Sequence, residues 1–121
     1  MASPVRAKYL LDCADMDRAI AFYEGTLGLR VVTQSPDWTE LDCAGAGIGL
    51  HGGATPGERH TGLSFTVVDI EATCAQAAAG GAQILSPPSH RPGEPMLAEL
   101  RDPEGNYFML SQDVVPESAD G

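Results

Sequence analysis

The two halves of this sequence resemble each other. A shift of 54 residues places Leu11 on Phe65 and Asp15 on Asp69, and shifts of 53 to 60 residues superpose the segments that follow. Apolar, capping and turn residues occur in the same order in both halves, which argues against a chance similarity of two alanine-rich segments. Because an internal repeat constrains architecture more strongly than any single propensity, we expect two copies of one structural unit.

Each half predicts a strand, a helix and three further strands. In the first half, alternating residues from Val5 to Cys13 predict a strand, Asp15 suits a helix cap, and helical spacing continues to Leu27 before Gly28. Further strands are expected at 29–34, 37–43 and 47–51, then at 60–68, 82–86, 96–100 and 107–112, with a second helix from Asp69 to Ala79 and loops at 87–95 and 102–106.

The length of 121 residues fits one domain. Within it, a Gly- and Pro-rich stretch at 52–59 has no periodicity and is the expected linker. We therefore expect a first module at about 5–51, a second at about 60–112, and a frayed tail at 113–121.

Composition excludes several classes of function. Seventeen acidic residues against seven Lys and Arg give a formal charge of −10, so nucleic-acid binding through phosphate contacts is not expected. No apolar run approaches the roughly 18 to 20 residues of a membrane span, and no basic segment followed by an apolar one opens the sequence. We expect a soluble, cytoplasmic protein that does not bind a membrane.

The three cysteines match neither a disulfide framework nor a zinc-type pair. They are odd in number and lie about 30 residues apart, at Cys13, Cys43 and Cys74. We expect reduced, mostly buried thiols without a nucleophilic role.

Three segments carry a resemblance to a known family. Residues 15–23 followed by 27–29 look like its first helix and exit, residues 63–70 like the start of its second module, and residues 101–106 like the turn before its last strand. Together they identify the chain as resembling the vicinal oxygen chelate superfamily, which includes glyoxalase I, bleomycin resistance proteins, fosfomycin resistance enzymes and extradiol dioxygenases. The resemblance implies an α+β fold of two tandem βαβββ modules, a curved mixed sheet around a cavity with the helices outside, and a homodimer.

Strand alternation then predicts which side chains line the cavity. The apolar faces pack on the helices, so the opposite faces look inward. The expected ligand-binding residues are Lys8, Trp38, Glu40, Asp42, His51, His60, Glu99, Tyr107 and Met109.

The resemblance also supplies positions for a divalent metal, one on each of four strands. In this sequence they are Lys8, Gly49, Gly62 and Met109, none of which is a plausible ligand for a hard divalent cation. We therefore expect no metal cofactor. A displaced site built from His51 and His60, with Glu40 or Glu99, remains an open alternative.

Two main hypotheses of function follow. The first is a metal-independent binding protein of the glyoxalase and bleomycin resistance family that sequesters a cationic or aromatic compound such as an antibiotic. In it, Trp38 and Tyr107 stack on the ligand and carboxylates select a cation. Arg6 and Lys8 favour the opposite charge, since an inward Lys8 could pair with a cavity carboxylate or bind an anionic ligand instead. The second is a metal-free or unusual-metal enzyme, an isomerase, lyase or glyoxalase-like protein acting on a small metabolite, with Lys8, Glu40, Glu99 or His60 as acid or base. A third class is an interaction domain without a ligand.

Overall fold

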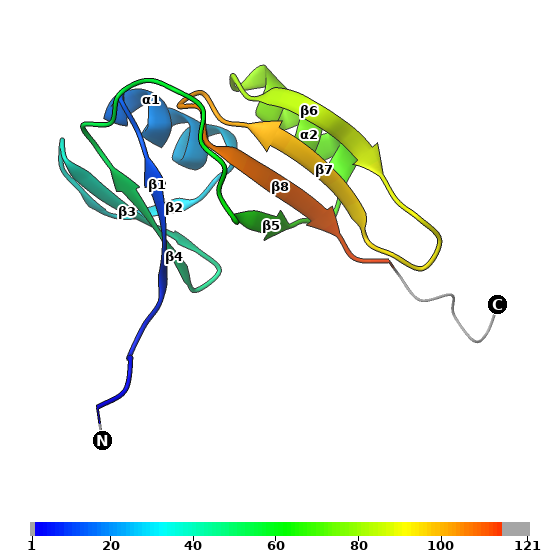
Figure 1. Cartoon of the computed structure of the whole chain (residues 1–121), viewed down its shortest axis with the longest axis horizontal. Coiled ribbons are helices and arrows are strands. Elements are labelled where there is room, and N and C mark those ends of the chain that lie inside the picture. Colours follow the sequence, from blue (N-terminus) through cyan, green and yellow to red (C-terminus); the bar gives the residue numbers. More distant parts are fainter. Residues whose placement is uncertain (1, 115–121) are drawn as a thin grey trace.

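The computed structural model describes residues 2–114, which form two four-stranded sheets, one from each half of the chain (Figure 1). The strand orders, β1-β4-β3-β2 and β5-β8-β7-β6, are equivalent, and in each sheet the first and last strands of the half pair in parallel. The α+β fold is thus confirmed, and the two sheets do not close into a barrel. The elements are β1 (Lys8–Asp12), α1 (Met16–Ile20), the π-helical η1 (Ala21–Thr26), β2 (Arg30–Gln34), β3 (Trp38–Cys43), β4 (Ala46–His51), β5 (Ser64–Thr66), α2 (Ile70–Ala79), β6 (Gln83–Ser89), β7 (Met96–Arg101) and β8 (Tyr107–Gln112).

Both helices begin where the sequence predicts. The Asp15 carboxylate accepts a hydrogen bond from the Arg18 backbone N–H, and that of Asp69 accepts one from Ala72, each at 3.0 Å. These bonds satisfy N–H groups that a first helical turn leaves without partners. The first helix differs from the expectation after Ile20, where its α-helical turns give way to the wider π-helical turns of η1.

The core lies between the helices and one face of each sheet. Leu11, Leu41 and Leu50 cover that face in the first half, and Leu100 and Leu110 do so in the second; all are almost fully buried. Helix α2 packs on its own sheet and also contacts η1, so the helical layer links the two halves. We call the opposite face of each sheet its concave face; it carries polar side chains such as Glu40 and Glu99 together with the exposed Leu10 and Leu97.

The second half departs from the expected strand bounds. Strand β6 continues through Pro87 and Pro88, where a loop was expected. Because β6 is the edge strand of its sheet, the missing N–H groups of these prolines break no ladder on the open side. Strand β5 is shorter than expected and holds only Ser64–Thr66.

A tight turn at Ala44 and Gly45 joins β3 and β4 in a hairpin. Ala44 and Gly45 both have positive φ, 49° and 96°, the combination that a two-residue hairpin turn requires. The turn fixes the register that places Glu40 opposite Gly49 and Trp38 opposite His51.

Residues 115–121, most of the expected tail, lie outside the described part of the chain. Among residues 2–114, no helix has both the length and the apolar character needed to span a bilayer.

Candidate functional site

The concave face of the first sheet carries a charged group around Glu40. This carboxylate lies on β3, opposite Gly49 of β4, and its side chain is only 10% exposed. Its Oε1 accepts a hydrogen bond from Arg6 Nη2 at 2.8 Å and lies 2.8 Å from Lys8 Nζ. The hydrogen bond from Lys8 and the nearby Arg6 lower the pKa of Glu40, so the group is ionised at neutral pH.

Trp38 lies beside this charged group. A Cβ on Gly49 would overlap the six-membered edge of the Trp38 ring, so the ring rests where a side chain at position 49 would otherwise lie. Lys8 Nζ is 5.4 Å from the ring centroid, within the range of a cation–π contact. Trp38 is half-buried, which leaves part of its ring accessible to a ligand.

The concave face of the second sheet holds the remaining expected site residues. His60 and Tyr107 meet edge to face with centroids 4.5 Å apart, and the Tyr107 hydroxyl donates to Glu58 at 2.6 Å. Glu99 of β7 and Met109 of β8 are register partners, and both are half-buried. Glu99 forms no ion pair with any described residue.

The structure assembles the expected residues in two groups. Lys8 contacts both Trp38 and Glu40, whereas Asp42 and His51 lie on the same face with partners of their own, Arg30 at 3.7 Å and Asp12 at 3.6 Å. The group on the second sheet is His60, Glu99, Tyr107 and Met109. Within the described residues, no ion pair or aromatic contact joins a member of one group to a member of the other.

The four metal positions implied by the family resemblance do not fit a divalent metal. The Lys8 ammonium is bound to Glu40, the Trp38 ring fills the side-chain space of Gly49, and the Tyr9 hydroxyl fills that of Gly62. Met109 offers only a thioether, which is a poor ligand for hard cations. Among residues 2–114, no three His, Cys, Asp or Glu side chains converge as a metal site requires.

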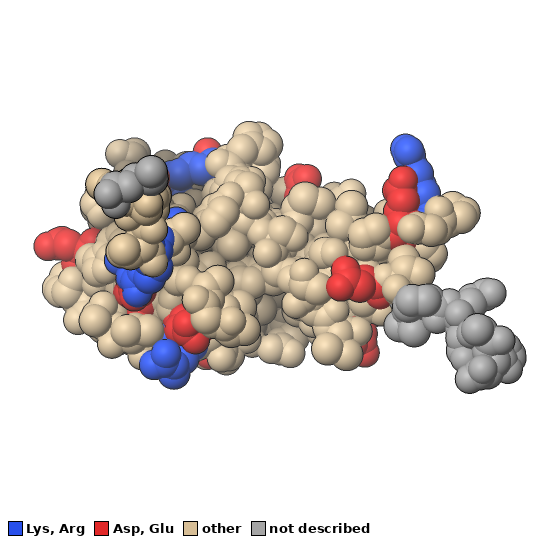
Figure 2. All heavy atoms as spheres, turned by 90° about the horizontal axis from the view of Figure 1, so that it is seen from below, with Lys and Arg blue, Asp and Glu red and all other residues tan. Residues whose placement is uncertain are grey.

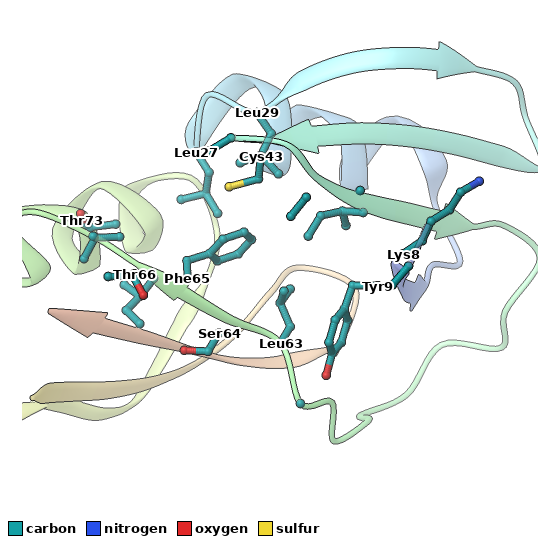
Figure 3. A pocket seen from close by; sticks show the side chains of 18 residues that line it. Lys8, Tyr9, Leu27, Leu29, Cys43, Leu63, Ser64, Phe65, Thr66 and Thr73 are labelled. Atoms are coloured by element: carbon teal, nitrogen blue, oxygen red, sulfur yellow. The ribbon is translucent and has the colours of Figure 1, made fainter. Parts of the chain in front are cut away.

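An apolar cleft of about 640 Å³ lies between the two halves, on the helical side of β1 and β4 (Figure 3). Phe65 points into it toward Leu27 and Cys43, while the amine of Lys8 points away from it. Tyr9 and Ser64 line the same cleft, although strand alternation assigns them to opposite kinds of face. Gly62, Ser64 and Lys8 all line this cleft, whereas Glu40 is not among its lining residues.

A buried polar group joins the two halves, and we call it the junction cluster: Arg18, Tyr23, Asp102, Glu104 and Asn106. Glu104, whose side chain is fully buried, accepts hydrogen bonds from the N–H groups of Ala14 and Asp15 at 2.9 and 2.7 Å and pairs with Arg18. Asp102 accepts from the Tyr23 hydroxyl and from Asn106 Nδ2. Sequence reasoning missed this cluster because Asp-Pro-Glu-Gly-Asn is typical of an exposed turn.

Burial also raises the pKa of one tyrosine and three cysteines. It raises the pKa of the Cys13 thiol to about 11, with the nearby carboxylates of Glu104 and Asp102 adding to the effect. Burial and then Asp102 raise the pKa of Tyr23 well above its ordinary value. Burial likewise raises the pKa of Cys43 and Cys74. All three cysteines are free thiols, and at neutral pH none is a ready nucleophile.

Two strand-helix-strand-strand-strand units, each with its helix on one face of a four-stranded sheet, define the class of protein. A family model described as the Glyoxalase/Bleomycin resistance protein/Dioxygenase superfamily matches residues 7–110, and the chain belongs to this superfamily. The family resemblance drawn from the motifs is thereby confirmed.

Known relatives agree with this assignment. The chain is 34% identical over 100 residues to the putative glyoxylase CFP32 of Mycobacterium bovis, an alignment that covers 78% of this chain and 38% of that protein. It thus spans less than half the length of this curated relative. A crystal structure of a family enzyme from Burkholderia phytofirmans has a TM-score of 0.77 at 22% identity, covering 88% of this chain and 97% of that chain. The fosfomycin resistance protein FosX of Listeria monocytogenes has a TM-score of 0.77 at 18% identity, covering 95% and 97%. At these identities, the likeness to the solved structures shows the shared fold.

Proposed function

We propose that this protein binds a small, flat organic molecule such as an antibiotic and does so without a divalent metal. The observation that carries the proposal is the placement of Trp38. Its ring occupies the space above Gly49, one of the metal-ligand positions of the family, and remains half-exposed beside Lys8. The Trp38 ring thus lies at the position where metal-dependent relatives carry a metal-coordinating side chain. This placement favours stacking of a ligand over metal-assisted chemistry.

The charges around Glu40 favour an aromatic ligand over a cationic one. Glu40 was the main candidate for attracting a cation, but Arg6 and Lys8 already neutralise it. The support from the structure is therefore for an aromatic ligand. The acidic composition of the chain does not by itself favour a cation at this face.

The proposal predicts that flat aromatic compounds perturb Trp38 when EDTA is present. The chain has a single tryptophan, so its indole N–H gives one signal in a ¹H–¹⁵N spectrum. Gly49→Ala should displace the ring and weaken binding about tenfold, because the stacking surface is lost. Gly25→Ala is the matched control, because Gly25 does not have a positive φ and a Cβ there would meet no other atom within 4 Å. An indole signal that does not move with any compound of a broad aromatic panel would refute the proposal.

The alternative is a metal-free enzyme of the same family. Among the four acid–base candidates, only Lys8 and Glu40 are in contact, with an ammonium and a carboxylate oxygen 2.8 Å apart. Such a pair can hold a proton near a bound metabolite. Turnover of a metabolite that disappears in Lys8→Met, while binding at Trp38 persists, would favour this alternative.

We also propose that the protein is a cytoplasmic homodimer. Leu10 and Leu97, on the concave faces of the two sheets, are 60% and 41% exposed. A second copy could cover these side chains and bring the first face of one protomer to the second face of its partner. Light scattering at micromolar concentration should give the mass of a dimer, and the mass of a single chain would contradict this proposal.

A further inference from the structure

The concave face of the first sheet carries an excess of positive charge in a chain whose formal charge is −10. Arg6 and Lys8 share one carboxylate, Glu40, and both bind the same oxygen, Oε1. The cations are more exposed than the anion, at 55% and 37% against 10% for their side chains. A guanidinium has five N–H donors and an ammonium three, so most of their donors are free for a ligand.

The other carboxylates on this face do not offset the excess. Asp42 is paired with Arg30 at 3.7 Å, and Asp12 lies 4.0 Å from Arg59 and 3.6 Å from His51. Each of these carboxylates therefore has an arginine of its own. Most of the Lys and Arg side chains visible in Figure 2 lie at the end of the molecule formed by the first half of the chain, with Asp and Glu side chains among them, while the middle of the view is largely uncharged.

Lys8 already occupies the position beside Trp38 where a cationic ligand would bind. The Lys8 ammonium lies 5.4 Å from the ring centroid and is held there by its ion pair with Glu40. A cationic ligand would have to displace Lys8 from both partners while lying close to a second cation, Arg6. A ligand stacked on Trp38 with an acidic substituent would instead meet unused donors of both side chains.

We infer that the ligand of this face is an aromatic anion, a planar ring system bearing a carboxylate or a comparable acidic group, held by Trp38 together with Lys8 and Arg6. This inference rests on the proposed function, namely that a flat molecule binds at Trp38. It assigns the sign of the ligand's charge, and it makes Lys8 and Arg6 the residues that determine specificity.

The experiment uses three probes with the same ring system and different charge. Naphthalene-2-carboxylate, naphthalene-2-carboxamide and (naphthalen-2-yl)methylammonium are titrated into the full chain with EDTA, and the Trp38 indole signal reports binding. The carboxylate should bind about tenfold more tightly than the amide, the effect of one charge-assisted hydrogen bond, and the ammonium should bind most weakly. Lys8→Met should abolish most of the preference, and Lys8→Arg should retain it.

Arg91→Met is the matched control, since it removes the same charge from the loop between β6 and β7, outside the site. It should leave the carboxylate preference unchanged. An ammonium that shifts the indole signal and binds as tightly as the carboxylate overturns this inference but leaves the proposed function intact. A preference that survives in Lys8→Met, or is lost equally in Arg91→Met, overturns the assignment to Lys8. No shift with any of the three probes overturns the inference and counts against the proposed function as well.

Discussion

The Glu104→Ala variant should lose about 3 kcal/mol of unfolding free energy. The Glu104 carboxylate is fully buried and accepts hydrogen bonds from two backbone N–H groups, those of Ala14 and Asp15, at the start of the first helix. Truncation leaves both N–H groups without this acceptor and removes the ion pair with Arg18. Chemical denaturation followed by circular dichroism measures the loss.

Two further variants make this expectation specific. Glu104→Gln keeps an acceptor oxygen for the backbone N–H groups and should lose only about half as much. Glu24→Ala removes an exposed carboxylate from η1 and should change stability by less than about 0.5 kcal/mol. A Glu104→Ala protein as stable as Glu24→Ala would show that the junction cluster does not hold the halves together.

Local sequence signals predicted the elements well, because each signal has a local cause. Asp15 and Asp69 cap the helices through residues three positions along the chain. The strands follow from alternation, and the repeat of these signals led to the family. The error at Pro87 and Pro88 also has a physical origin. An edge strand tolerates proline, and whether a strand lies at the edge depends on the arrangement of the whole sheet, which local sequence does not show.

The candidate site could be predicted only in part, because alternation defines faces but not how two sheets are oriented. Lys8, Trp38 and Glu40 share one face of one sheet, and the register of β3 and β4 brings them together as expected. At Gly62, the hydroxyl of Tyr9, from the other face of β1, fills the side-chain space, and this contact between the halves does not follow from alternation. The orientation of the halves depends on the junction cluster, whose contacts join residues as much as 94 positions apart.

The sign of the charge at the site was left open by the sequence, which offered both carboxylates for a cation and Lys8 for an anion. A count of acidic residues suggested that Glu40 would attract a cation, yet the sign of a local field depends on which side chains are neighbours. Arg6 precedes β1 and reaches Glu40, 34 residues away, so two cations surround one carboxylate. A net charge of −10 describes the whole surface and does not describe this face.

Gly105→Ala should destabilise the protein by about 3 kcal/mol or more, by a different mechanism from Glu104→Ala. Gly105 has a φ of +92°, and a Cβ there would overlap the backbone carbonyl of Gly57. The chain segment around Gly57 lies against this turn, and the Arg59 N–H donates to the Gly105 carbonyl at 2.7 Å. A methyl group would therefore push the segment away from the turn and break this bond.

Gly53→Ala separates the two contributions to that loss. Gly53 has a similar φ of +85° but open space around its Cβ position, so the substitution should lose only about 1 to 2 kcal/mol through backbone strain. Equal losses of unfolding free energy in Gly53→Ala and Gly105→Ala would mean that the overlap with Gly57 contributes nothing to the destabilisation.

Because Lys8, Trp38 and Glu40 all come from the first half of the chain, Gly105→Ala should keep the affinity of the folded protein for an aromatic probe at Trp38. A parallel loss of that affinity would show instead that the site needs both halves held in place by the junction.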